Sequence, residues 1–237
     1  MCVQSQILPS ISREDELPMT MQVGMVGSDG IVLASDTKWT ENHAASGSSV
    51  RQDWSSPKID LDPTRKVAVA CAKDMRKGVQ IARAILAELS SDHWENPQPK
   101  LEEIAASRSS PHSPFEAECL IGLACPSPRL FHLACGCSGG PALCTQIQDR
   151  RAAGDALNSA LFWHMRYYKV MPVRKLIRLA AQIIVDAAEI SSGGIGGLKI
   201  AYTKGPGFRF LPDEETREVE AEARKRGSQI EKLLLAI

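Results

Sequence analysis

Residues 20–36 read TMQVGMVGSDGIVLASD and carry the clearest structural signal in the chain. Met21–Met25 alternates as a half-buried strand does. Asp29-Gly30 follows as a turn, since Asp-Gly is a preferred dipeptide in tight hairpins. The apolar run Ile31–Ala34 then has the length of a second strand. The segment therefore predicts a β-hairpin, with Asp36 just past its end.

The rest of the chain predicts strands in adjacent pairs, separated by helices. After a polar interval at 37–57, which reads as a loop or a loose hairpin, the expected strands are Lys58–Leu61, Val67–Cys71, Cys119–Ala124, Leu130–Ala134 and Leu198–Tyr202. The expected helices are Asp74–Leu89, Lys100–Ala106, Ala142–Arg151, Val173–Glu189 and Asp213–Leu235. Paired strands disfavour a doubly wound parallel sheet. They predict an α+β fold in which two mainly antiparallel sheets pack together and helices cover them outside.

Composition narrows the class of protein. The chain has 237 residues, 43% hydrophobic and 24% charged, as ordinary globular proteins do. Its 28 basic and 28 acidic side chains cancel, so the clustered positive charge of a nucleic-acid-binding protein is missing. No stretch approaches the roughly 20 apolar residues that cross a bilayer. We expect neither a nucleic-acid nor a membrane partner, and a cytoplasmic location.

The domain boundary is predicted near residue 20. Residues 1–19 lack sustained periodicity and are expected to be a leader, or to result from a misassigned start. Residues 20–237 are expected to form one domain, because two packed antiparallel sheets covered by helices account for the order of the predicted elements.

Several familiar sites are excluded by their missing motifs. The seven cysteines contain no Cys-x-x-Cys pair, and Cys135-x-Cys137 with nearby His132 is a poor zinc pattern. The chain also lacks a phosphate-binding loop, a nucleophile elbow and a His-Glu-x-x-His helix. Gly193–Gly197 lies between a helix and a strand, the reverse of a dinucleotide loop. We therefore expect no cofactor and no metal.

The opening hairpin resembles the start of mature proteasome β-type subunits and of related bacterial ring proteases. In that family a threonine opens the first strand, as Thr20 does, and a glycine turns the hairpin, as Gly30 does. An aspartate stands sixteen residues after the threonine, at Asp36 here, and a Lys-Ile pair precedes the next strand, at Lys58. The order continues with Asp74 at the start of a helix.

Two further stretches extend the resemblance to about Tyr202. Residues 136–139 resemble the family's Gly-Ser-Gly turn, and residues 189–194 resemble its Asp-x-x-Ser-Gly-Gly. The resemblance implies a four-layer αββα sandwich, the fold of N-terminal-nucleophile hydrolases. It also implies catalytic positions at Thr20, Asp36, Lys58, Ser138, Glu189 and Ser192.

The chemistry of these residue types supports that implication. A threonine hydroxyl is a weak nucleophile until a base takes its proton. The free α-amino group of the same residue has a pKa of about 7.7–8.0, near working pH. A positive Lys58 beside the hydroxyl would favour the alkoxide, and Asp36 would hold that ammonium in place. In the family, residues matching Ser138, Glu189 and Ser192 orient the amine and water.

The sequence departs from the family at three places. Thr20 is internal, so it must be exposed by cleavage after Met19, or by removal of Met19 if synthesis starts there; an uncleaved leader gives an inactive subunit. Residues 70–73, Ala-Cys-Ala-Lys, lack the glycine that serves the family's oxyanion hole. Glu189 replaces an aspartate.

Each candidate residue also has a structural alternative. Thr20 is a common residue type in strands. Asp36 could cap a turn and Lys58 could be a surface lysine. Ser138 could serve only its turn, and Ser192 could only end a helix.

The leading hypothesis is a threonine endopeptidase. It would act on peptides or unfolded proteins within a homo-oligomeric ring, with a possible ATPase or activator ring as partner. The alternatives are a catalytically inactive scaffold subunit and an amidase acting on small molecules.

Overall fold

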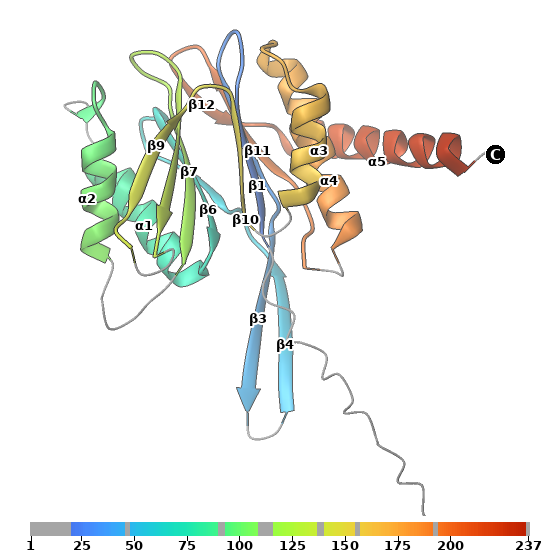
Figure 1. Cartoon of the computed structure of the whole chain (residues 1–237), viewed down its shortest axis with the longest axis horizontal. Coiled ribbons are helices and arrows are strands. Elements are labelled where there is room, and N and C mark those ends of the chain that lie inside the picture. Colours follow the sequence, from blue (N-terminus) through green and yellow to red (C-terminus); the bar gives the residue numbers. More distant parts are fainter. Residues whose placement is uncertain are drawn as a thin grey trace, which may run out of the picture.

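The computed structural model describes residues 20–45, 48–89, 93–108, 116–136, 140–154, 157–191 and 194–235. In these ranges two five-stranded sheets stack face to face between helices (Figure 1). The strands are β1 (Met21–Val26), β2 (Ile31–Ser35), β3 (Lys38–Ala45), β4 (Ser48–Ser55), β5 (Ile59–Leu61), β6 (Val67–Lys73), β7 (Ala117–Leu123), β8 (Arg129–Cys135), β9 (Leu143–Ile147), β10 (Arg150–Gly154), β11 (Lys199–Lys204) and β12 (Gly207–Phe210). The helices are α1 (Met75–Glu88), α2 (Gln98–Arg108), α3 (Leu157–Tyr167), α4 (Val173–Ile190) and α5 (Asp213–Leu235).

The predicted opening hairpin is the centre of the first sheet, whose strand order is β10-β1-β2-β11-β12. β1 and β2 pair antiparallel with Val23 opposite Ala34, and Gly27 N donates to Gly30 O at 2.6 Å to close the turn. All four strand pairings in this sheet are antiparallel. The register brings the first residue of the hairpin next to the residue that follows β2.

The second sheet has the order β5-β6-β7-β8-β9, again with antiparallel neighbours throughout. Three separate apolar cores show that the fold has four layers. One core lies between α1, α2 and the second sheet, one lies between the two sheets, and one lies between the first sheet, α3 and α4. The predicted αββα sandwich is therefore confirmed.

The contact between the sheets depends on close approach at Gly122. A Cβ at this position would lie 2.5 Å from Cζ of Phe208, so the glycine leaves the space that the phenyl ring fills. Phe208 is 2% exposed. Burial of an aromatic side chain of this size contributes about 1.5–3 kcal/mol.

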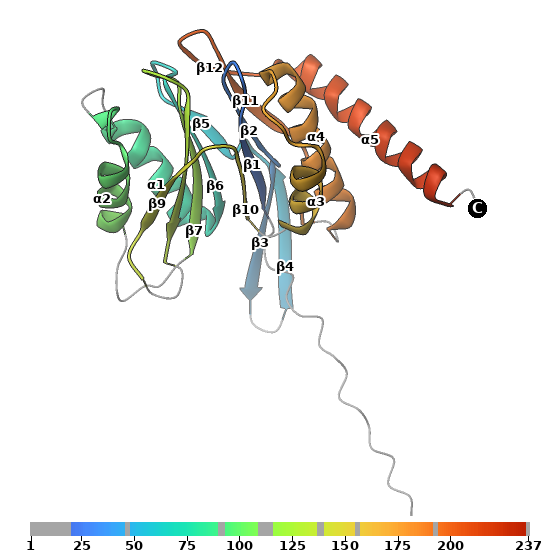
Figure 2. The ribbon, with the colours of Figure 1, turned by 45° about the horizontal axis from the view of Figure 1, so that its top comes forward.

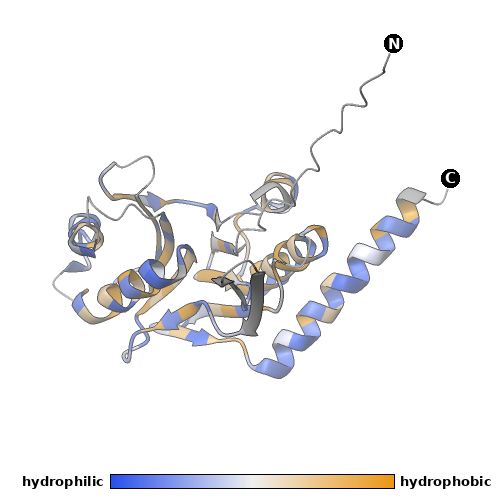
Figure 3. Cartoon of the chain, turned by 90° about the horizontal axis from the view of Figure 1, so that it is seen from below, coloured by the Kyte–Doolittle hydropathy of each residue, from blue (hydrophilic) through white to orange (hydrophobic). Residues whose placement is uncertain are grey.

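The outer helices follow from their sequence patterns. Asp74 caps α1 by accepting a hydrogen bond from Lys77 N at 2.9 Å, as its place before the apolar stripe predicts. The apolar helix α4 is covered by the first sheet on one side and by α3 and α5 on others (Figure 2). α5 is largely hydrophilic along its length and extends away from the body (Figure 3). No helix in the described ranges is both long and apolar enough to span a membrane.

One predicted element is wrong. Residues 142–151, expected to form a helix, instead supply β9 to the second sheet and β10 to the first. Each sheet gains an outer strand, and this strand pairing outweighs the weak local preference of the segment for a helix. Strand β12 and helix α3 were not predicted. The polar interval at 37–57 forms the β3–β4 hairpin, which projects from the sandwich (Figure 1).

Candidate active site

Three of the predicted site residues lie together where the first sheet meets β5. Thr20 immediately precedes β1, Asp36 immediately follows β2, and Lys58 immediately precedes β5. The β1–β2 register accounts for the first two, because Asp36 N donates to Met21 O and Met21 N donates to Asp36 Oδ1, both at 3.1 Å. The fold thus brings together residues that are 38 positions apart.

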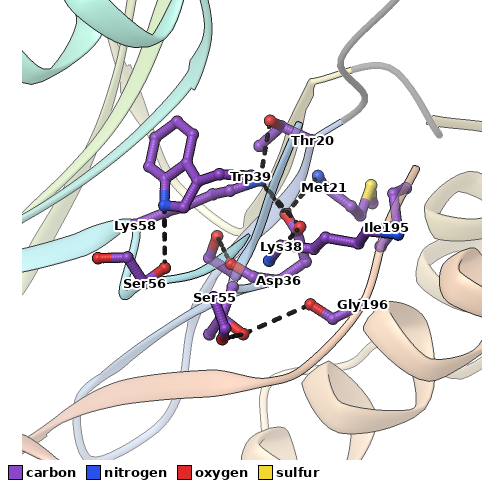
Figure 4. Close-up of polar contacts among 12 residues, drawn as sticks. Thr20, Met21, Asp36, Lys38, Trp39, Ser55, Ser56, Lys58, Ile195 and Gly196 are labelled. Carbon is purple, nitrogen blue, oxygen red and sulfur yellow. Dashed lines mark hydrogen bonds and ion pairs between the residues drawn. The ribbon is translucent and has the colours of Figure 1, made fainter. Parts of the chain in front are cut away.

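The Lys58 ammonium joins the other two side chains. Its Nζ lies 3.1 Å from Thr20 Oγ1, and 2.8 and 3.0 Å from the two carboxylate oxygens of Asp36 (Figure 4). The exposed fractions of Thr20, Asp36 and Lys58 are 4%, 0% and 2%. Lys58 is therefore a buried, paired lysine, which excludes the surface-lysine alternative.

Burial sets the electrostatics of this cluster. Removal from water raises the pKa of the Asp36 carboxyl, while the Lys58 ammonium and backbone N–H groups of Met21 and Lys38 oppose that rise. A carboxyl whose pKa is raised by folding binds its proton more readily in the folded state. Protonation of Asp36 therefore does not by itself drive acid unfolding.

The loop before β11 anchors the segment after Asp36. Gly196 O accepts hydrogen bonds from Thr37 N at 2.9 Å and Lys38 N at 3.0 Å. Gly197 has φ +70°, and a Cβ there would lie 2.1 Å from Thr37 Oγ1, so glycine is needed for this close approach. The glycines that sequence reasoning set aside as a rejected cofactor loop support the site instead.

Gly154 and Glu118 support the backbone of Thr20 from the other side. Gly154 has φ +103°, and a Cβ there would lie 2.0 Å from Thr20 O. Its N–H donates to Glu118 Oε2 at 3.1 Å, which links the end of β10 to β7 in the other sheet. Lys73 Nζ lies 3.3 Å from Glu118 Oε1. No motif in the sequence predicts this support.

Glu118 is expected to couple stability to acid pH. Burial acts to raise the pKa of Glu118, but His132, the Gly154 N–H and Lys73 outweigh it and lower that pKa to about 2. The resulting stabilisation is complete above the ordinary glutamate pKa of about 4.3 and is lost as pH falls toward 2. Glu118→Gln should therefore reduce the free energy of unfolding by about 2–3 kcal/mol at neutral pH, and the deficit should shrink below pH ~4.

Urea unfolding of both proteins at a series of pH values measures this difference. Glu103→Gln is the matched control, since Glu103 pairs with Lys100 and its side chain is 68% exposed. A Glu118→Gln deficit that stays constant from pH 7 to pH 3 would contradict the assigned pKa.

Of the remaining candidate residues, the structure describes Glu189, which lies away from the cluster. Glu189 lies on the exposed end of α4 and faces α5, where its carboxylate is 3.7 Å from Arg224 Nη1. Ser138 and Ser192 lie outside the described residues, as does the predicted leader, residues 1–19.

Lys73 adopts φ +68°, which glycine adopts more readily than lysine does. It ends the stretch where the resemblance led us to expect glycine. Its ammonium pairs with Glu116 at 3.1 Å and with Glu118. Two neighbouring acidic residues thus offset the positive charge of Lys73.

The described residues contain no group of three or more His, Cys, Asp or Glu that could hold a metal ion. Of the rejected zinc pattern, Cys135 is buried in the core under α1 and α2, His132 is also buried, and Cys137 lies outside the described residues.

Comparison with known proteins extends the result for the fold. No protein-family profile and no curated protein sequence matches this chain. Among solved structures, the Gly-1 mutant of Anbu from Hyphomicrobium sp. strain MC1 aligns with a TM-score of 0.63 and 15% sequence identity, covering 89% of this chain and 96% of that one. The chain therefore shares its four-layer αββα fold with Anbu.

Proposed function

We propose that this chain is a threonine endopeptidase subunit of a proteasome-like ring, with Thr20 as its nucleophile. The observation that carries the proposal is the 3.1 Å contact between Lys58 Nζ and Thr20 Oγ1, held by the buried Asp36 pair. The shared fold adds support, because Anbu has a sandwich of the same kind.

The proposed reaction begins when the Met19–Thr20 bond is opened. The liberated α-amine of Thr20 takes the proton from Oγ1, and Oγ1 attacks the carbonyl carbon of a peptide bond. The amine proton passes to the departing amino group as the C–N bond breaks, leaving an ester on Thr20. Water then attacks the ester, releases the acid product and returns the proton to Oγ1.

Lys58 and Asp36 have separate roles in this proposal. The Lys58 ammonium beside Oγ1 stabilises the developing alkoxide and keeps the neighbouring α-amine neutral, because a second positive charge there is unfavourable. Asp36 accepts two hydrogen bonds from that ammonium and fixes its direction.

Intact-mass measurement of the purified protein tests the proposal. We expect a mature chain that begins at Thr20 and hydrolyses fluorogenic peptides, since only a free Thr20 amine can serve as the base. A chain that keeps residues 1–19 and has no activity would identify a scaffold subunit. Activity on small amides without activity on peptides would identify an amidase. Native mass spectrometry of the same sample tests the proposed homo-oligomeric ring.

A further inference from the structure

Trp39 packs against the ammonium of Lys58 on the side of the active-site cluster. Lys58 Nζ lies 4.8 Å from the centroid of the Trp39 ring, and the tryptophan is 8% exposed (Figure 4). This distance is within the range in which a cation is attracted to the negative face of an indole. Trp39 was not predicted as a site residue, because it stands at the start of a polar interval.

The ring is held in place by the base of the β3–β4 hairpin. Trp39 Nε1 donates to Ser56 O at 3.1 Å, and Ser56 N donates to Thr37 O at 2.9 Å. These bonds fasten the chain before Trp39 to the chain just before Lys58. The indole position is therefore coupled to the position of the lysine backbone.

Such a neighbour adds to the stabilisation of a buried ammonium. At 2% exposure Lys58 has lost nearly all of its water, and that loss disfavours the ammonium form. Two Asp36 oxygens and Thr20 Oγ1 can take its three N–H donors. The aromatic face adds attraction without competing for a hydrogen bond.

We propose that Trp39 is a positioning residue that holds the Lys58 ammonium, charged, against the hydroxyl of Thr20. The inference rests on the proposed function, because the contact matters for catalysis only where Thr20 is the nucleophile. Trp39 acts through Lys58 and touches no reacting atom in this role.

Two substitutions separate the effect of the aromatic ring from the effect of the indole N–H bond to Ser56. Trp39→Phe keeps an aromatic face but loses the indole N–H, whereas Trp39→Leu loses both. We expect kcat for peptide hydrolysis to fall about tenfold or more in Trp39→Leu, with KM changed less than about threefold, and Trp39→Phe to recover much of that loss. Trp94→Leu is the matched control, since Lys66 Nζ also lies 4.8 Å from the Trp94 ring; we expect its kcat to stay at the wild-type value.

Fluorinated tryptophan, inserted at position 39 alone, provides a version of the test that keeps the shape of the core. Fluorine withdraws electron density from the ring face, so we expect kcat to fall stepwise with each added fluorine. If kcat stays at the wild-type value in all fluorinated forms and in Trp39→Leu, the inference is overturned, even where the wild-type protein hydrolyses peptides.

Crystal structures keep the two proposals distinguishable. We expect Lys58 Nζ to leave its 3.1 Å contact with Thr20 Oγ1 in Trp39→Leu and to keep it in Trp39→Phe. An unmoved Nζ in Trp39→Leu overturns the positioning role. A wild-type protein that hydrolyses no peptide overturns the proposed function alone, and the Nζ positions still decide the role of Trp39.

Discussion

Peptide hydrolysis should fall at least about ten-thousandfold when Thr20 is replaced with alanine, because the variant has no side-chain oxygen to form the ester. The substitution removes one hydroxyl and one methyl group at a site that is 4% exposed. The Lys58–Asp36 pair keeps its 2.8 Å contact, so the cluster does not lose its charge balance. The free energy of unfolding should therefore change by only about 1 kcal/mol.

Two companion variants make this result specific. Thr145→Ala removes a threonine from an exposed position on β9, and its activity should equal that of the wild type. Thr20→Ser keeps the hydroxyl but loses the methyl group that restricts χ1, so it should retain part of the activity. Initial rates on one fluorogenic peptide compare the three variants with the wild type. Equal rates for wild type and Thr20→Ala would exclude Thr20 as the nucleophile.

Local signals predicted most of the fold. Alternation and an Asp-Gly turn were enough for β1 and β2, and a capped apolar stripe was enough for α1. α5 begins and ends at the predicted residues, 213 and 235. In these segments the local preference and the tertiary pairing favour the same structure, and sequence reasoning succeeds under that condition.

The failures occur where only the tertiary pairing decides. Residues 142–151 contain few β-branched residues, and they become strands because each sheet has an edge available for one more partner. In the site, too, some residues were predicted from local patterns and others were not. Resemblance to a known pattern predicted Thr20, Asp36 and Lys58. Trp39 and Gly154 contribute through contacts across the fold, which no local motif encodes.

Asp36→Asn should destabilise the protein by about 3–5 kcal/mol at neutral pH, because it leaves the buried Lys58 ammonium without a counter-charge. The asparagine amide has only one oxygen that can accept hydrogen bonds. The two oxygens of the carboxylate accept from Lys58 Nζ, Met21 N and Lys38 N. Hydrolysis should fall by at least about a hundredfold, since Lys58 no longer has a fixed direction. Urea unfolding and initial rates measure the two effects separately.

A double variant distinguishes lost charge balance from lost packing. Lys58→Met alone removes the ammonium that opposes the burial of Asp36, so the pKa of Asp36 should rise further. Asp36→Asn with Lys58→Met leaves no charge in this pair, and the double variant should lose less stability than the sum of the two single losses, by more than about 1 kcal/mol. Its activity should not recover, because the cation beside Oγ1 is gone.

The exposed pair of Lys199 and Asp213 supplies the control for this cycle. Their nitrogen–oxygen distance of 3.0 Å is close to that of the buried pair, but the Asp213 side chain is 84% exposed. Water already solvates the Asp213 carboxylate, so Asp213→Asn should leave the urea midpoint almost unchanged. A similar small change in Asp36→Asn would mean that Lys58 is not held as a charged partner. The catalytic role of the trio would then lose its electrostatic basis, since an uncharged amine at 3.1 Å from Thr20 Oγ1 cannot favour the alkoxide.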